Sequence, residues 1–210
     1  MINETSGQAF GIELVVVRHG ETEWNLQKRA QGHKDIMLND TGVAQAMHAA
    51  KLLQNEKFDA IYTSDLKRAN DTGKIIVKQL NTPPSGGFFT DKRIREKFFG
   101  KLEGMHFDNA ATKEATLQGN EGLAKGAESH EDFQRKVISF LHDLKEKHAE
   151  GDRILIATHG GVVRTFFNEA GRKDFVDVKN GSISRFLLSP QEKLQSFEST
   201  QAPPLATRPG

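Results

Sequence analysis

Basic and nucleophilic side chains stand directly after the most apolar runs of this sequence. Arg18 and His19 follow LVVV, and His159 follows RILIAT. Arg68 and Glu96 stand in two segments between these runs. A neutral imidazole can attack phosphorus when its second ring nitrogen is fixed by a hydrogen bond, and a planar guanidinium binds phosphate oxygens two at a time. These residue types therefore predict a nucleophile beside a phosphate clamp.

The elements that must position these residues alternate between strands and helices. The predicted strands cover residues 12–17, 58–63, 87–94, 153–158 and 182–188, and the predicted helices cover 41–56, 66–80, a segment opened by Ser129, and 160–170. Such alternation predicts a three-layer α/β/α sandwich with a mostly parallel central sheet. In open sheets of this kind the ligand binds at the carboxyl ends of the strands. The five polar residues are thus expected to meet at one edge.

Apolar spacing and capping residues give more detailed expectations for the helices. In helix 41–56, Val43, Met47, Ala50 and Leu53 are spaced as one buried face. Ser64 and Asp65 are expected to cap the next helix rather than to react, and Ser129 with an acid three residues later predicts a capping box. Trp24 is expected to pack. His48, His142 and His148 fall in helices and are expected to be solvated, while His106 and His130 are unassigned.

Composition limits the classes of function. The 29 Lys and Arg nearly balance the 28 Asp and Glu, for a formal charge of +1, so no strongly basic face is expected for nucleic acid or an anionic membrane. There is no cysteine, which excludes disulfides, thiolate catalysis and thiolate zinc sites. The apolar stretches are shorter than the roughly 20 residues that span a bilayer, and the start of the chain lacks a secretory pattern. These features predict a cytoplasmic protein, and they leave its oligomeric state open.

The expected organisation is a single domain with two loose ends. Residues 1–10 read as an arm, 11–189 as the domain, and the Pro-rich segment 190–210 as a disordered tail. Residues 105–128 are small, polar and Gly-rich, and their structure is left open.

Four motifs, RHGETEWN, TSDLKRA, REKFFGKLEG and THGGVVR, resemble those of the histidine phosphatase (phosphoglycerate mutase-like) superfamily. They occur in the order of that family and cover residues 12 to about 188. Four ordered matches are far more specific than RHG alone. The resemblance implies the phosphoglycerate mutase-like fold and phosphoryl transfer without metal or cofactor.

The resemblance also implies a role for individual residues. His19 is the residue that would become phosphohistidine, and Glu96 would be the general acid that protonates the leaving oxygen and later deprotonates water. Arg18, Arg68 and His159 would complete the catalytic set. The expected phosphate- and substrate-binding positions are Arg18, Thr22, Asn25, Gln31, Gly32, Arg68, His159 and Gly160.

The family contains phosphatases and mutases, and the sequence favours a phosphatase. Bisphosphoglycerate-using mutases resemble RHGESxWNxxNRFxGW, whereas Gln31-Gly32-His33 here resembles the phosphatase branch. The mutases also carry a long insertion after the glutamate motif, with an adjacent pair of arginines. The corresponding segment here, residues 105–128, is short and contains no arginine. The expected substrate is a small phosphorylated metabolite, and Lys97, Lys101, Lys113 and Lys125 are candidates to contact a second anionic group. A phosphoglycerate mutase and a non-catalytic phosphate-binding module remain the alternatives.

Overall fold

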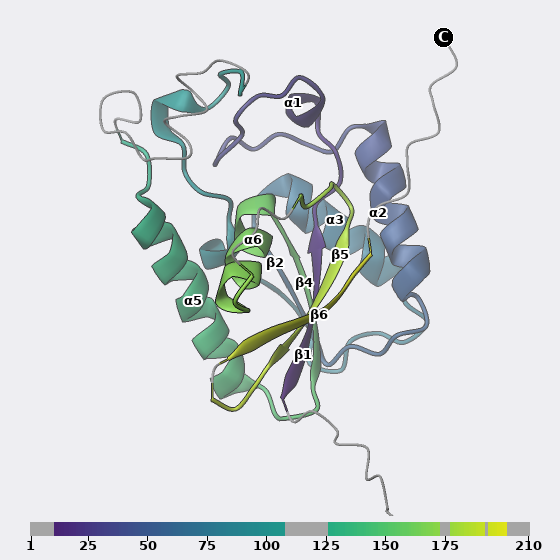
Figure 1. Cartoon of the computed structure of the whole chain (residues 1–210). Coiled ribbons are helices and arrows are strands. Elements are labelled where there is room, and N and C mark those ends of the chain that lie inside the picture. Colours follow the sequence, from purple (N-terminus) through teal and green to yellow (C-terminus); the bar gives the residue numbers. More distant parts are fainter. Residues whose placement is uncertain (1–10, 108–125, 173–176, 192, 201–210) are drawn as a thin grey trace, which may run out of the picture.

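A six-stranded sheet forms the centre of the computed structural model, which describes residues 11–107, 126–172, 177–191 and 193–200 (Figure 1). Its strands are β1 (Ile12–Arg18), β2 (Ala60–Thr63), β3 (Phe88–Thr90), β4 (Arg153–Thr158), β5 (Ile183–Leu188) and β6 (Leu194–Thr200), in the order β3-β2-β4-β1-β5-β6. The first four run parallel, and β5 and β6 are antiparallel to their neighbours. The expected mostly parallel sheet is confirmed.

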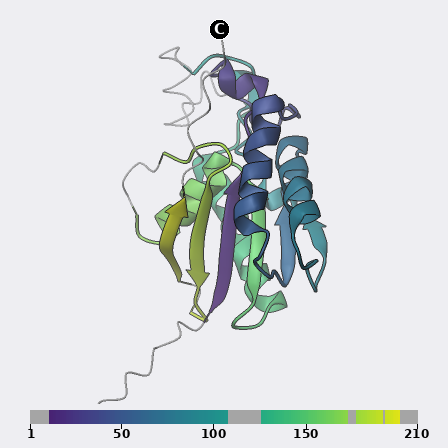
Figure 2. The same cartoon turned by 90° about the vertical axis from the view of Figure 1, so that its right-hand side faces the viewer.

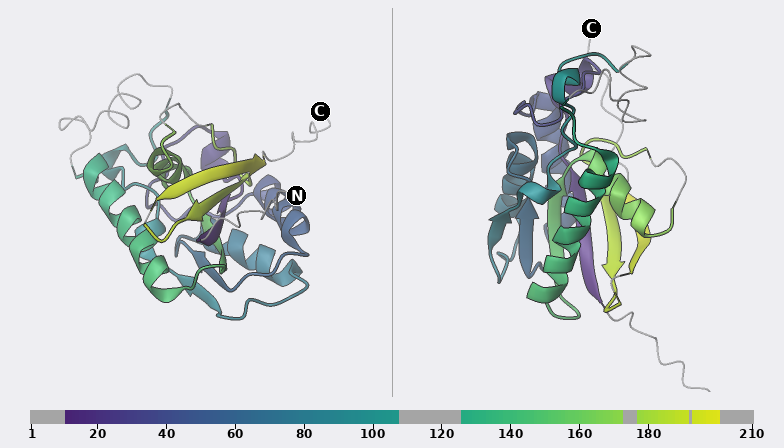
Figure 3. Two further views of the ribbon diagram at one scale, coloured as in Figure 1. Left: turned by 60° about the horizontal axis from the view of Figure 1, so that its bottom comes forward. Right: turned by 90° about the vertical axis from the view of Figure 1, so that its left-hand side faces the viewer.

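Helices cover both faces of the sheet. One layer holds α2 (Asp40–Leu53) and α3 (Lys67–Gln79), and the other holds α5 (His130–Lys147) and α6 (Gly160–Glu169) (Figures 2 and 3). Because side chains alternate along a strand, Leu14 and Val16 of β1 join the core with α5 and α6, whereas Val15 and Val17 join the core with α2 and α3. A continuous apolar run is therefore what a strand covered on both faces requires. None of the described helices is long and apolar enough to cross a membrane.

Short elements lie at the carboxyl ends of the strands. They are α1 (Glu23–Leu26) and two 3₁₀ helices, Lys92–Ile94 and Gly100–Leu102, and α1 lies above the end of β1 (Figure 1). The prediction of one strand over residues 87–94 is wrong in extent, because β3 ends at Thr90. The Asp91 side chain accepts a hydrogen bond of 2.8 Å from the Arg93 N–H and so caps the 3₁₀ helix that replaces the strand.

The buried face of α2 agrees with the predicted one at Ala50 and Leu53, which are buried, and differs from it in the first half of the helix. Val43 and Met47 are 38% and 53% exposed, whereas Ala46 and Ala49 are buried. Small residues face inward because α2 begins in backbone contact with the loop after β1. A Cβ on Gly42 would lie 2.0 Å from the Glu21 carbonyl oxygen. Close approach of two backbones decided the face, against the hydrophobic spacing.

The expected end of the sheet at residue 188 is also wrong. Residues 194–200, assigned to a disordered tail, form β6 and pair with β5 from Ile183↔Thr200 to Leu188↔Leu194. The turn between the strands is closed by a bond of 2.9 Å from the Ser189 N–H to the Lys193 carbonyl. Leu194 is buried against the core of α5 and α6. The expected arm, 1–10, and the rest of the tail, 201–210, lie outside the described residues.

Candidate active site

Most of the predicted site residues surround one cavity of about 230 Å³ at the carboxyl edge of the sheet. Its lining includes Arg18, His19, Asn25, Gln31, Gly32, Arg68, Glu96 and Gly160. His159 does not line this cavity, but its ring contacts His19, with the two ring centroids 5.2 Å apart. Separate segments supply these groups: the end of β1, the first turn of α3, the segment after β3, and the start of α6.

His19 is buried and held in one tautomer. Its Nδ1 lies 2.6 Å from the Gly20 carbonyl oxygen, and since a carbonyl only accepts, Nδ1 carries the proton. Nε2 then keeps its lone pair. Burial, followed by the charges of Arg68 and Arg18, holds the pKa of His19 well below its usual value. His19 is therefore neutral at physiological pH, as a nucleophile must be.

The protonation state of His19 is directly measurable. Long-range ¹H–¹⁵N NMR is expected to show a His19 ring that is protonated at Nδ1. This ring should not titrate near pH 6.5, where an ordinary His side chain with a pKa of about 6.5 does. Because the pKa is lowered, the neutral form persists below that pH and is lost only on further acidification. His19→Gln identifies the signal by its disappearance. A midpoint at or above about 6.5, or an Nε2-protonated ring, would contradict this assignment.

His159 presents two unsatisfied ring nitrogens. The residue is fully buried, and neither Nδ1 nor Nε2 has a hydrogen-bond partner among the described residues. Burial, then the charge of Arg68, holds the pKa of His159 well below its usual value. The ring is therefore neutral and carries one N–H without an acceptor among the described residues. Such unpaired buried groups are rare in native proteins and point to a ligand.

Arg68 is fixed by two backbone carbonyls. Its guanidinium donates to Lys34 O and Gly32 O, both at 2.8 Å, while its buried Nε has no partner among the described residues. Burial lowers the pKa of Arg68 to about 10, so the group remains charged at neutral pH. A cation in the first turn of α3 faces the positive end of the helix dipole. A bound anion would compensate for both the charge and the free N–H.

Glu103 holds the loop that supplies these carbonyls. Its Oε1 accepts a bond of 2.7 Å from the His33 N–H. Gly32 has a φ of 51°, and a Cβ there would lie 2.1 Å from the same oxygen. Glycine at this position therefore lets the carboxylate approach and turns its own carbonyl toward Arg68.

Arg18 has a similar arrangement at the end of β1. One terminal nitrogen donates to the Val178 carbonyl, and the buried Nε has no partner among the described residues. Burial, then the nearby charge of Arg164, lowers the pKa of Arg18 to about 10. Arg18 and Arg68 thus share one feature, a buried N–H at the same cavity without an acceptor in the part of the chain that the structure describes, and His159, in contact with His19, has a buried N–H of the same kind.

Glu96 is held at the cavity by backbone donors. Its Oε1 accepts from Lys97 N at 2.9 Å and its Oε2 from Gly161 N at 3.1 Å. A Cβ on Gly161 would lie 2.1 Å from Oε1, so the second glycine of the HGG motif makes room for this carboxyl group. The geometry gives Glu96 a fixed position from which a proton can reach a ligand in the cavity.

Asn25 and Thr22 form the capping box of α1. The amide oxygen of Asn25 accepts from the Thr22 N–H at 3.2 Å and from Asn180 Nδ2 at 3.3 Å, which leaves its own NH₂ for the cavity. Thr22 is fully buried and donates to Gln31 Oε1 at 3.0 Å. Thr22, a predicted substrate-binding position, is not among the residues that line the cavity. Its hydroxyl group instead supports Asn25 and Gln31 through hydrogen bonds.

Other predictions near the site also need correction. Asp65 does not cap α3 but pairs with Arg95 at 2.6 and 2.5 Å. The Lys67 N–H in the first turn instead donates to Asp35 at 2.7 Å. Ser64 accepts from the Leu66 N–H at 3.3 Å.

Of the lysines proposed for a second anionic group, the two that the structure describes do not line the cavity. Lys97 is buried elsewhere and Lys101 is exposed, while Lys113 and Lys125 lie outside the described residues. Four residues missed in the sequence line it instead: Arg29, Phe99, Phe107 and Arg164. Arg164 ends the motif THGGVVR and stands four residues after Gly160. Residues four apart lie on the same face of a helix, so this spacing could have predicted that Arg164 lies at the cavity with Gly160.

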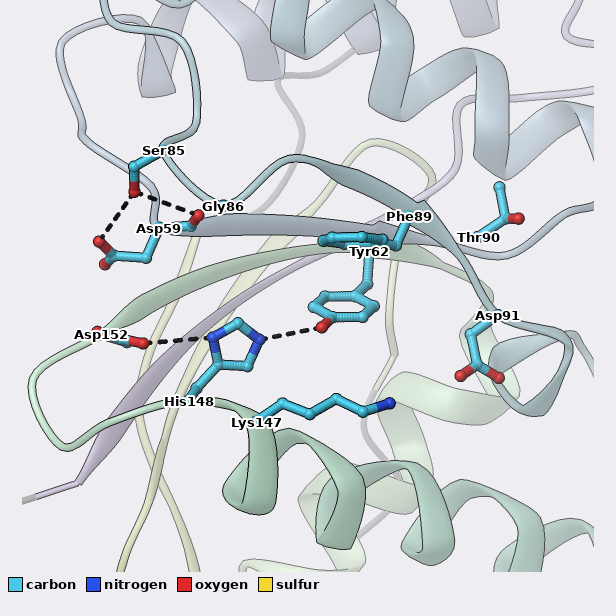
Figure 4. Close-up of a pocket in the computed structure, with 10 residues that line it drawn as sticks. All are labelled: Asp59, Tyr62, Ser85, Gly86, Phe89, Thr90, Asp91, Lys147, His148 and Asp152. Carbon is cyan, nitrogen blue, oxygen red and sulfur yellow. Dashed lines mark hydrogen bonds and ion pairs between the residues drawn. The ribbon is translucent and has the colours of Figure 1, made fainter.

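A larger hollow of about 690 Å³ contains none of the predicted catalytic residues. It lies beside β2, β3 and the end of α5, and its centre is a chain of hydrogen bonds (Figure 4). His148 Nδ1 lies 3.2 Å from Asp152, and its Nε2 lies 3.0 Å from the Tyr62 hydroxyl. The expectation that His148 is solvated is wrong, because it follows α5 as its C-cap and links that helix to β2.

This chain of hydrogen bonds is expected to stabilise the fold. Tyr62→Phe removes only the hydroxyl bonded to His148, so we expect the free energy of unfolding in urea to fall by about 1 kcal/mol. In a His148→Ala background the same substitution should cost clearly less, because the partner is already gone. Equal losses in both backgrounds would show that the hydroxyl contributes through another contact.

The fold and the cavity together define an α/β protein equipped to bind and transfer a phosphoryl group. The chain matches the family model of the histidine phosphatase superfamily (branch 1) over residues 14–197. It therefore belongs to the histidine phosphatase superfamily, a family of enzymes, and the resemblance of the four motifs is confirmed.

The similar proteins include some that are named after phosphoglycerate mutase and others that are named phosphatases. Phosphoglycerate mutase-like protein 4 of Arabidopsis thaliana is 33% identical over 191 residues, covering 86% of this chain and 81% of the relative. A metal-independent phosphoserine phosphatase of the same plant is 34% identical over 163 residues, covering 74% and 67%. The crystal structure of TTHB049 from Thermus thermophilus superimposes with a TM-score of 0.69 at 30% identity, covering 90% of this chain and 99% of that one.

Proposed function

We propose that this protein is a metal-independent phosphatase that hydrolyses small phosphomonoesters through a phosphohistidine on His19. One observation carries the proposal. The free Nε2 of His19 shares a cavity with buried donors of Arg18 and Arg68 that are unpaired among the described residues, and the ring of His159 contacts that of His19. A tetrahedral dianion would satisfy these donors and lie beside the nucleophile.

The first chemical step transfers the phosphoryl group to His19. Nε2 attacks phosphorus as the bond to the alcohol oxygen breaks, and Glu96 in its protonated form gives its proton to the departing alkoxide. The phosphorylated ring gains positive charge, which the Gly20 carbonyl stabilises through Nδ1–H. The guanidiniums of Arg18 and Arg68 neutralise the equatorial oxygens.

The second step returns the enzyme to its starting state. A water molecule attacks phosphorus from the side that the alcohol has left, and the Glu96 carboxylate accepts its proton. The phosphorus–nitrogen bond breaks, which releases inorganic phosphate and neutral His19 protonated at Nδ1. Protons and charges balance over the cycle without a metal ion.

A phosphatase is favoured over a mutase by the residues at Gln31-Gly32-His33 and by the name of the phosphoserine phosphatase relative. The decisive experiment measures two products. In the presence of a chelator, the protein is expected to release inorganic phosphate from 4-nitrophenyl phosphate and from a panel of metabolite phosphomonoesters. Faster isomerisation of 3-phosphoglycerate than phosphate release, with a bisphosphoglycerate primer, would favour the mutase. Phosphate binding without either reaction would favour a binding module.

A further inference from the structure

We propose that Arg29 and Arg164 bind a second acidic group of the substrate, so that the preferred phosphomonoesters carry a carboxylate or another anion. This inference rests on the proposed function, because it assumes that the phosphate occupies the cavity beside His19. It assigns a purpose to two arginines that the phosphoryl chemistry does not require.

Arg164 is a half-buried cation at the cavity, on the first turns of α6. It makes no hydrogen bond or ion pair with the described part of the chain. A Cβ on Gly160 would lie 3.3 Å from its Nη1 and 3.5 Å from Arg18 Nε, so the two guanidiniums flank the same glycine. Burial is the main cause of the lowered pKa of Arg18, and the positive charge of Arg164 is the next largest. Two like charges held together at a cavity favour a bound anion.

Arg29 approaches the same cavity from the loop after α1. Its Nη1 donates to the Gly104 carbonyl at 3.0 Å, which fixes the direction of the side chain. Its Nε is buried and has no partner among the described residues. Arg29 therefore offers an oriented, unsatisfied N–H from a different segment than Arg164.

The charges around the cavity exceed what one phosphate neutralises. Among the described residues, four guanidiniums line it against the single carboxylate of Glu96. The nearby carboxylates of Glu103 and Asp177 have partners, since Glu103 accepts from the His33 N–H and Asp177 pairs with Lys179. A phosphate monoester carries about −1.5 to −2 at neutral pH. One positive charge or more is left for a further acidic group.

Two aromatic rings form another part of the cavity wall. Phe99 and Phe107 line it with their ring centroids 6.2 Å apart. These rings offer no hydrogen-bond partner to a hydroxyl group of the substrate. A carboxylate of the substrate can instead accept two hydrogen bonds from the planar guanidinium group of an arginine. The preference should therefore depend on charge rather than on hydrogen bonding alone.

The test compares two phosphonates that bind but cannot be hydrolysed. They are 3-phosphonopropionate and propylphosphonate, which differ only in a carboxylate replacing a methyl group. Isothermal calorimetry of the wild-type protein is expected to show about tenfold or tighter binding of the carboxylated compound, the usual strength of a charge-assisted bond. Arg164→Gln is expected to reduce this ratio to less than about threefold, and Arg29→Gln provides the second variant. The control Arg135→Gln, at an exposed ion pair on α5, should keep the wild-type ratio.

Three outcomes would overturn the inference: equal affinities in the wild type, a ratio unchanged in both variants, or equal weakening of both phosphonates in both variants. The last result would place Arg29 and Arg164 in the phosphate clamp. If neither phosphonate binds, the assignment of the cavity as a phosphate site is contradicted as well. Failure of the proposed function is seen separately, as an absence of phosphate release despite selective binding of 3-phosphonopropionate.

Discussion

His19→Ala is expected to lower kcat for phosphate release on the order of 10⁴-fold or more, because the substitution removes the group that forms the covalent intermediate. In the proposed mechanism Nε2 of this histidine is the nucleophile, and the bond of 2.6 Å from Nδ1 to the Gly20 carbonyl fixes the ring. His159, the residue after β4, cannot replace it, because the centroid of its ring lies 5.2 Å from that of the His19 ring. The measurement is steady-state phosphate release from 4-nitrophenyl phosphate in a chelator.

Two controls separate this chemical role from a loss of structure. His142→Ala changes an exposed histidine of α5 and is expected to retain full activity. The wild-type protein, quenched during turnover of ³²P-labelled substrate, should carry label that is lost in acid and stable in base, and His19→Ala should carry none. Activity above about a tenth of wild type in a folded His19→Ala protein would refute the covalent mechanism.

Glu96→Gln is expected to slow turnover of alkyl phosphates by about 10²- to 10⁴-fold, the usual contribution of a general acid. Glutamine cannot donate a carboxyl proton to the leaving alkoxide. 4-Nitrophenolate leaves without a proton, so the loss on 4-nitrophenyl phosphate should be at least about tenfold smaller than on an alkyl phosphate. The measured quantity is kcat on the two substrates in the same variant.

The dependence on the leaving group distinguishes chemistry from a disturbed loop. Glutamine also replaces one of the two oxygens that accept from Lys97 N and Gly161 N, so some structural loss is expected on every substrate. Glu128→Gln supplies the comparison, because Glu128 accepts from the Phe98 N–H at 3.1 Å in the same segment. Its effect should be small and equal on both substrates. An equal loss on both substrates in Glu96→Gln would remove this residue from proton transfer.

The features that depend on local pattern were predictable from the sequence. The strand over Arg153–Thr158 was predicted with its observed bounds, because an apolar run between polar ends specifies a strand buried on both faces. Ser129 caps α5 as expected and accepts from the Asp132 N–H at 2.9 Å. Since carboxyl ends of parallel strands share one edge, sequence position alone predicted that Arg18, His19 and His159 would lie together.

Contacts between distant segments decided what the pattern could not. β6 forms because β5 offers an open edge. The exposed faces of Val43 and Met47 follow from the close approach of Gly42 to the loop after β1, and no spacing of hydrophobic residues reports a backbone contact.

The sequence by itself determined the central parallel strands, the order of the motifs and the residues available for phosphoryl chemistry, because strand alternation and helix caps act over a few residues. Only the tertiary structure decided which N–H groups lack acceptors within the described chain, and that Arg29 and Arg164 join the cavity. Desolvation and cavity lining depend on segments that are far apart in the chain. They exist only once the layers have packed.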